Sequence, residues 1–293
     1  MTATMSDSGV ARMPGRRPRR GITLPALRYL VLIVGAAIMV LPFLYMLSTS
    51  FKGQTYVLTI PPQFIPHPAT TANYSQAWTE NSLGRYLLNS LFVAAVSTVL
   101  SLLLSSMMAY AFARFAFPLR EVLFKVLLLG LMIPAMMLII PQFILVKYLG
   151  LFDSLSGLIL FYVGSSLSLN TFLLRGFFRA IPTELEQAMQ VDGAGAFVRY
   201  WRLILPLAKP ALATATIFTF LGSWDEYVWA VTIINTPTKR TLPIAIALFQ
   251  GQNSTLWGLV FAASIIAIVP VIVVFLLFQR YFVQGLTAGA VKG

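Results

Sequence analysis

The sequence contains no cysteine, and His67 is its one histidine. Disulfides, thiolate chemistry and a histidine metal cluster are therefore excluded. Charge is also scarce, because 10% of the 293 residues are charged whereas 58% are hydrophobic. The mean hydropathy of +0.82 is far from the balance of a soluble domain. We predict an integral membrane protein, and a redox or zinc enzyme is not expected.

A second absence concerns nucleotide binding. The pattern G-x-x-x-x-G-K-[ST], whose backbone amides cradle phosphate groups, does not occur in the sequence. We therefore do not expect this chain to bind ATP through such a loop. If ATP supplies energy to its function, that energy must enter through another subunit.

Long apolar runs are what the sequence does have. A membrane-spanning helix needs roughly 20 apolar residues, and five runs are that long. They cover residues 29–51, 86–113, 126–146, 154–174 and 257–279. A sixth run, 210–234, is equally apolar apart from Asp225 and Glu226. We predict an all-α membrane protein with six transmembrane helices.

The basic residues orient these helices. If the amino terminus is cytoplasmic, 16 of the 21 lysines and arginines fall on the cytoplasmic side. The positive-inside rule favours this orientation, with both termini in the cytoplasm. The net charge of +12 is then explained by topology and by attraction to anionic membrane lipid, so nucleic-acid binding is not expected.

The runs divide the chain into five predicted parts. Residues 1–28 form a disordered basic cytoplasmic tail. The others are the first transmembrane helix at 29–51, an external loop at 52–85, a core at 86–279 and a cytoplasmic C-terminal tail at 280–293. The core holds the other five helices and a cytoplasmic loop at 175–209.

The most polar stretch between two runs is ELEQAMQVDGAGAFVRYWRLILPLAKP, which starts at Glu184. Thr183 and Glu186 have the T-x-x-E spacing of a capping box, which predicts a helix beginning at Glu184. Gly193 suits the position after the helix end, where a left-handed conformation costs glycine little. The predicted helix has about two turns.

One face of this short helix carries Leu185, Ala188, Met189 and Asp192 at positions i, i+3, i+4 and i+7. A compact face with a small residue in the middle is shaped to enter a groove. A second amphipathic run, AFVRYWRLIL, follows it and includes Arg199. These residues leave two interpretations open, which are docking on a partner protein and lying on lipid headgroups.

The same stretch resembles the cytoplasmic-loop signature E-A-A-x3-G-x9-I-x-L-P of permease subunits in binding-protein-dependent ABC importers. The positions that follow its spacing are Gln187, Ala188, Met189, Gly193, Leu203, Leu205 and Pro206. IPTELEQAMQVDGA, LILPLAKPAL and the closing FQRYFVQGLTAGAVKG are similar to the carbohydrate-type, MalG-like branch. The similarity covers about residues 86–293. Gln187 and Met189 depart from the signature, which has Glu and Ala there.

The resemblance implies a MetI-like type I ABC importer permease fold in the cell (inner) membrane. It implies a transporter subunit rather than an enzyme, importing a sugar or related polar solute. The implied partners are a second, different permease, an ATPase dimer that binds ATP and Mg, and an extracytoplasmic solute-binding protein. No cofactor is implied on this chain.

The resemblance also implies two groups of residues that contact the ATPase. The coupling group is Leu185, Glu186, Gln187, Ala188, Met189, Asp192, Gly193, Arg199, Leu205 and Pro206. The tail group is Gly285, Thr287, Gly289 and Lys292. Gln187 can form a hydrogen bond but carries no charge. Glu186 is a candidate replacement for the missing acid, although adjacent helical residues point about 100° apart.

Asp225 and Glu226 are unusual because carboxylates are costly inside an apolar run. We predict that they line a translocation path or gate together with Asn170, Trp224 and Tyr227. Each has a structural alternative. The acids could form interhelical hydrogen bonds, the aromatic residues could anchor at the membrane interface, and Asn170 could join two helices.

Two other classes of protein compete with the permease. In an ion-coupled secondary transporter, Asp225 and Glu226 would be the coupling acids, but the sequence lacks the internal symmetry typical of that class. A membrane-embedded enzyme needs a nucleophile, acid or metal constellation. The acids are few, and His67 lies in a predicted external loop.

Overall fold

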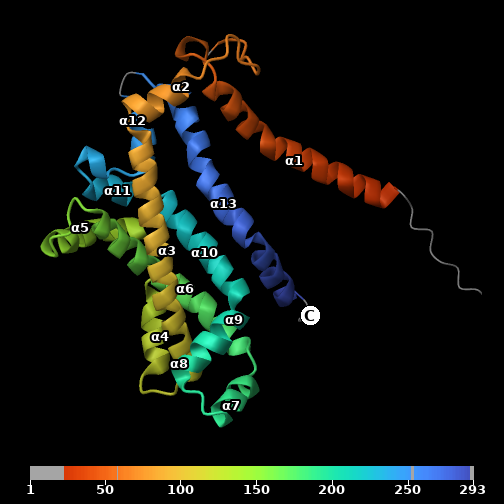
Figure 1. Cartoon of the computed structure of the whole chain (residues 1–293), viewed down its shortest axis with the longest axis vertical. Coiled ribbons are helices and arrows are strands. Elements are labelled where there is room, and N and C mark those ends of the chain that lie inside the picture. The colour runs from red at the N-terminus through yellow and green to blue at the C-terminus, as the bar shows by residue number, and fades with distance from the viewer. Residues whose placement is uncertain (1–22, 58, 252–253, 291–293) are drawn as a thin grey trace, which may run out of the picture. The chain divides into compact units, whose positions relative to one another are not determined.

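The computed structural model describes residues 23–57, 59–251 and 254–290. Within these ranges the chain is helical and has no β-strand (Figure 1). It divides into two compact units, Met1–Tyr45 and Met46–Gly293. Helix α1 (Thr23–Ser50) supplies the described part of the first unit. The predicted tail at 1–28 is therefore too long, since α1 begins at Thr23, and residues 1–22 lie outside the described part of the chain.

In the part of the chain that the structure describes, four helices are long and apolar enough to cross a membrane. They are α1, α3 (Leu83–Arg114), α6 (Leu155–Ala180) and α13 (Trp257–Ala290). A fifth candidate is a bent pair, in which Ala196–Leu207 meets Lys209–Trp224 at 78°. The prediction of an all-helical chain is thus confirmed for the described residues, whereas the number six and the orientation of the termini stay predictions.

The predicted run at 126–146 is not one helix. It is divided among α4 (Arg120–Leu129), the 3-10 turn η3 (Ala135–Leu138) and α5 (Ile139–Tyr148). Pro134 immediately precedes η3 with extended backbone angles. Proline lacks an N–H donor and disfavours helical geometry at the residue before it. The prediction of an apolar run at 126–146 is therefore right, whereas the prediction that this run forms one helix is wrong.

The predicted run at 210–234 is also interrupted. Helix α10 (Lys209–Trp224) ends before Asp225, and α11 (Val228–Ile233) begins after Tyr227. The two acids that stood out in the sequence therefore lie in the break between two helices rather than inside one.

The second unit is built around α3 and α6, which pack closely along their length. Buried small residues recur on α3 at every fourth position, at Ser97, Ser101, Ser105 and Ala109. Small side chains let two helix backbones approach. The hydroxyl of Ser101 also hydrogen-bonds that of Ser166 on α6.

Short elements occupy the two ends of this unit. At one end are η1 (Gln54–Tyr56), α2 (Ala72–Ser75), the π-helical turn η2 (Gln76–Glu80), η5 (Pro237–Lys239) and α12 (Leu242–Leu248). At the opposite end are α7 (Thr183–Val191), α8 (Ala196–Arg199), the π-helical turn η4 (Tyr200–Ile204) and α9 (Leu205–Leu207). Figure 1 shows α2 and α12 at the end far from α7.

Candidate functional site

Helix α7 begins at Thr183, one residue before the predicted start. The predicted capping box is wrong, because the residue before the helix is Pro182 and no side chain caps it among the described residues. Glu186 turns inward instead. Its Oε1 atom lies 2.5 Å from Nε of Arg114, and its Oε2 atom accepts a hydrogen bond of 3.1 Å from the Tyr110 hydroxyl.

The end of α7 follows the prediction. Gly193 has a φ of +81°, in the left-handed region. The N–H of Ala194 donates to the carbonyl of Met189 at 2.9 Å, and the N–H of Gly193 donates to that of Gln190 at 3.0 Å. These two bonds form a Schellman motif, which satisfies the last carbonyl groups of a helix.

The outer face of α7 is open. Leu185 is 43% exposed and Val191 is 88% exposed, and Gln187, Ala188 and Asp192 are exposed as well. Apolar side chains in water or at a headgroup surface indicate an interaction site when they cluster. Glu186 is buried against Arg114 and is not on this face. Its role as a replacement for the acid that the signature places at Gln187 stays a prediction, which this position does not favour.

The segment after α7 is tied to it and to the bundle. The guanidinium of Arg199 donates to Oε1 of Gln190 at 2.7 Å. The ring of Tyr200 packs 5.4 Å from that of Tyr110, and its hydroxyl hydrogen-bonds Ser106 at 2.7 Å. Leu205 is partly buried and packs against the hydrophobic cluster that contains Tyr110 and Tyr200. Pro206 is exposed. The predicted coupling residues are thus brought together at one end of the unit.

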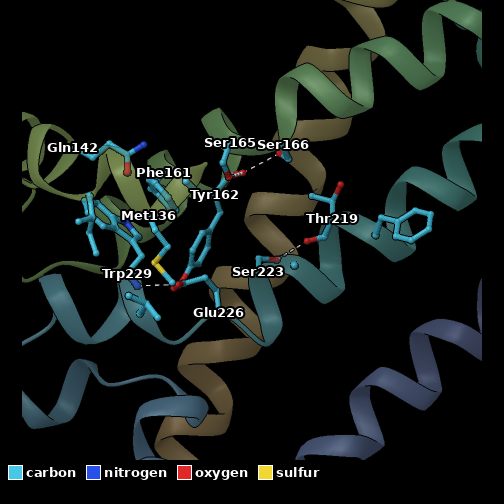
Figure 2. Close-up of a pocket in the computed structure, with 15 residues that line it drawn as sticks. Met136, Gln142, Phe161, Tyr162, Ser165, Ser166, Thr219, Ser223, Glu226 and Trp229 are labelled. Carbon is cyan, nitrogen blue, oxygen red and sulfur yellow. Dashed lines mark hydrogen bonds between the residues drawn. The ribbon is translucent and has the colours of Figure 1, made fainter. Parts of the chain in front are cut away.

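A cavity of about 250 Å³ lies where the two interrupted runs meet. Figure 2 shows this cavity and the side chains around it. The lining residues come from η3, α5, α6, α10, α11 and the break before α11, and they are Ala135, Met136, Ile139, Gln142, Phe161, Tyr162, Ser165, Ser166, Phe218, Thr219, Gly222, Ser223, Glu226, Val228 and Trp229.

Glu226 holds the break beside this cavity in place. Its Oε1 atom accepts from the backbone N–H of Trp229 at 2.7 Å, and its Oε2 atom accepts from that of Ala230 at 3.0 Å. The hydroxyl of Tyr162 on α6 donates to Oε2 at 2.8 Å, and Figure 2 shows the Tyr162 side chain reaching toward Glu226. The carboxylate therefore caps α11 and joins it to α6.

Asp225 faces a different space. It lines a second cavity, of about 290 Å³, with Trp224 and Tyr227 and with residues of α12 and α13. Trp224 is 3% exposed and stacks on Phe220 at 5.5 Å. The two adjacent acids are thus separated, and the predicted path residues do not form one group.

Asn170 lines neither cavity. It is 1% exposed, and its side-chain N–H donates to the Thr219 hydroxyl at 2.8 Å. This bond joins α6 to α10, which is the structural alternative weighed for Asn170. Thr219 itself lines the first cavity, so Asn170 orients a residue of its wall.

Comparison with known proteins decides the family. Residues 101–288 match the family described as the binding-protein-dependent transport system inner membrane component. The chain belongs to this family. The permease is 38% identical over 264 residues to the trehalose transport system permease protein SugB of Mycobacterium tuberculosis, covering 89% of this chain and 95% of the relative.

Two further relatives agree. The permease is 36% identical over 252 residues to the sulfoquinovosyl glycerol transport system permease protein SmoH of Agrobacterium fabrum, covering 86% of this chain and 88% of SmoH. A crystal structure of a bacterial ABC transporter involved in the import of the acidic polysaccharide alginate superposes with a TM-score of 0.75 at 25% identity, covering 91% of this chain and 99% of the other. The resemblance to carbohydrate-type importer permeases is thereby confirmed.

The C-terminal segment of the permease differs from the predicted tail. Helix α13 continues through Gly285, Thr287 and Gly289 to Ala290, so the tail predicted at 280–293 begins inside a helix. Lys292 lies outside the described residues. Contact of this segment with an ATPase stays a prediction.

Several residues of the site were missed by the sequence analysis. Arg114 was counted only as a basic residue near a helix end, and Gln142 and Tyr162 were passed over. Gln142 and Tyr162 are polar side chains inside apolar runs, which is a usable signal. Arg114 carried no such signal, because its partner Glu186 lies 72 positions further along the chain.

Proposed function

We propose that the permease is the transmembrane subunit of an ATP-driven importer for a sugar or related polar solute. The observation that carries this proposal is the similarity, over 86–89% of the chain, to permeases named for trehalose and sulfoquinovosyl glycerol transport. The solute is delivered by an extracytoplasmic binding protein, and ATP with Mg is bound and hydrolysed by separate ATPase subunits. A second, different permease completes the membrane part.

In this proposal α7 is the helix that docks on the ATPase. Its open face offers Leu185, Ala188 and Val191 for apolar contact, with Gln187 and Asp192 for polar contact. Because Arg114 is the last residue of α3, the Arg114–Glu186 ion pair passes a displacement of α7 directly to a long helix of the bundle. Both termini and α7 then lie on the cytoplasmic side, as the positive-inside rule favours.

The translocation path is proposed to run beside the interrupted helices. Non-helical backbone at membrane depth is tolerated where it is buried in protein or lines a cavity. The break at Asp225–Tyr227 satisfies this condition on both sides, since Glu226 lines one cavity and Asp225 the other.

The test is affinity purification of the tagged chain from its native membrane in mild detergent, with identification of the proteins that remain bound. We expect an ATPase, a second permease and a solute-binding protein. The assembly should then take up solute into vesicles only when ATP and the binding protein are both supplied. A chain that purifies alone and transports under an ion gradient without ATP would instead be a secondary transporter.

A further inference from the structure

The first cavity has an unusual set of polar groups for a space between membrane helices. The indole N–H of Trp229 and the Oε1 atom of Gln142 have no hydrogen-bond partner among the described residues, and both side chains line the cavity. Trp229 is only 2% exposed. A buried donor or acceptor without a partner destabilises the fold, because it has lost its hydrogen bond to water and gained none in the protein. A donor and an acceptor are therefore held ready for a polar molecule.

The cavity also has acceptor capacity at Glu226. A carboxylate offers about four acceptor positions, and the contacts with Trp229 N, Ala230 N and the Tyr162 hydroxyl occupy three. One position is left. Ser165 and Ser223 already donate their hydroxyl hydrogens to helix carbonyls, so both can accept from a bound molecule as well.

Aromatic rings form another part of the wall. The rings of Phe161 and Trp229 lie 4.4 Å apart at an angle of 31°, and Phe218 and Tyr162 also line the space. Binding sites for small molecules are mostly apolar and aromatic, with a few placed polar groups that fix orientation. Rings next to several acceptors and one free N–H suit a molecule with an apolar ring face and hydroxyl groups around its edge.

The volume and the charge of the first cavity further restrict which molecules could bind in it. The volume of about 250 Å³ equals that of about eight water molecules at roughly 30 Å³ each, which is room for one sugar ring. Among the described residues that line the cavity, Glu226 is the one charged group. A second negative charge there would be repelled in a medium of low dielectric constant, and no described lysine or arginine of the lining offsets it.

We propose that this cavity is a subsite for a single neutral or cationic sugar ring and that it rejects anionic sugars. The proposal rests on the proposed function, because it takes the cavity as part of the import path. It adds a selectivity that acts inside the membrane, after selection by the binding protein.

The absence of cysteine in this chain provides a direct test. Ser165→Cys places a single thiol in the cavity wall, and Ser264→Cys is the matched control. Ser264 on α13 is also a membrane serine bonded to a helix carbonyl, that of Val260, but it lies outside the cavity lining. The rate of thiol modification on this chain is measured in the assembled importer in vesicles, after ATP-driven uptake has been verified.

We expect glucose and glucosamine to slow modification of Ser165→Cys severalfold and glucuronate to leave the rate unchanged. None of the three should protect Ser264→Cys. A cationic methanethiosulfonate reagent should react faster at Ser165→Cys than an anionic one, and Glu226→Gln should reduce that preference. If Ser165→Cys impairs assembly, Ser223→Cys on α10, which also lines the cavity, provides the same measurement.

The outcomes separate the two proposals. Equal protection by glucuronate and glucose, or no protection by any sugar in vesicles that do take up solute with ATP, would overturn the subsite while leaving the importer assignment intact. Vesicles that contain the whole assembly yet show no ATP-driven uptake would overturn the importer assignment itself.

Discussion

The Nε atom of Arg114 lies 2.5 Å from Oε1 of Glu186, and both side chains are only 10% exposed. This ion pair joins the last residue of a 32-residue helix, α3, to the first turn of α7. A second guanidinium N–H of Arg114 donates to the carbonyl of Ile181 at 2.6 Å. α7 is therefore held to the bundle by an ion pair in addition to the covalent chain.

Glu186→Gln should weaken this attachment strongly. Removing one partner of a buried ion pair leaves the other charge uncompensated and costs about 3–5 kcal/mol. We expect a lower apparent melting temperature of the purified assembly and ATP hydrolysis that no longer drives solute uptake. The measurement is uptake and ATPase activity in the same vesicles.

Glu184→Gln is the matched control for that change, because Glu184 is an exposed acid of the same helix turn. It should leave coupling unchanged. The exchanged pair Arg114→Glu with Glu186→Arg should recover part of the loss, and the two single variants complete a double-mutant cycle. Purely additive effects in that cycle would count against a direct pair.

Gly193→Ala should loosen the end of α7. At a φ of +81°, a residue with a Cβ atom costs roughly 1–2 kcal/mol more than glycine. No atom lies within 4 Å of the position that this Cβ would occupy, so the cost comes from the backbone alone. We expect reduced coupling of ATPase activity to uptake, measured with the permease still present in the membrane.

Two further variants test whether the effect of Gly193→Ala comes from the left-handed backbone. Gly195→Ala is the control, since Gly195 has a φ of −66° and equally open surroundings, and it should behave as the parent. Gly193→Asn should fall between, because asparagine tolerates the left-handed region better than alanine. Equal effects of all three substitutions would show that the left-handed turn does not matter.

Asp225 and Glu226 should respond differently to loss of charge. Glu226→Gln replaces an acceptor of three hydrogen bonds and should lower both the yield of folded assembly and uptake. Asp225→Asn should lower the rate of uptake severalfold with normal yield, because Asp225 faces a cavity. Unchanged uptake kinetics for Asp225→Asn would leave that acid without a role in the path.

Asp153 gives a prediction about pH. Its side chain accepts from the hydroxyl and backbone N–H of Thr236 and from the N–H of Asn235, and Lys239 lies 3.5 Å away. The Thr236 hydrogen bonds, more than Asn235 and Lys239, lower the pKa of Asp153 from 3.8 to about 2. The stabilisation is therefore complete above pH 4 and is lost as the pH falls toward 2.

Asp153→Asn should accordingly lower the melting temperature of the detergent-solubilised permease by a few degrees at neutral pH. The gap between variant and parent should close as the pH is lowered through the same range. Because the Asp153 side chain is 21% exposed and its partner Lys239 is 45% exposed, the effect should be well below that of Glu186→Gln, whose ion pair is more deeply buried. A gap that stays constant down to pH 2 would mean that the charge of Asp153 does not contribute.

The sequence predicted best what depends on neighbouring residues. The apolar runs predicted the long helices, and Gly193 predicted the end of α7, because both are properties of a few adjacent positions. The runs at 126–146 and 210–234 were each predicted as one helix, although breaks at Gly130–Pro134 and Asp225–Tyr227 divide them, because hydropathy continues across both breaks. Glu226 is held by Tyr162, 64 positions away, and no local pattern reports such a contact.

Glu186 is a second residue whose role depends on a distant contact. The T-x-x-E pattern gave it a local role as part of a capping box, and that interpretation was wrong. A carboxylate next to a buried guanidinium gains more from the charge than from one backbone N–H. The competing partner belongs to another helix, so spacing within α7 could not reveal it.

The serines of α3 have a consequence for depth in the bilayer. From Ser97 to Ala109, the small buried positions extend over about 18 Å of helix at 1.5 Å per residue. That is more than half of a hydrocarbon core of about 30 Å. Ser97, Ser101 and Ser105 are all 0% exposed, so none of these hydroxyls meets a lipid tail. A hydropathy scale counts each hydroxyl as a cost of insertion, although in this fold these positions of α3 face neighbouring helices and not lipid.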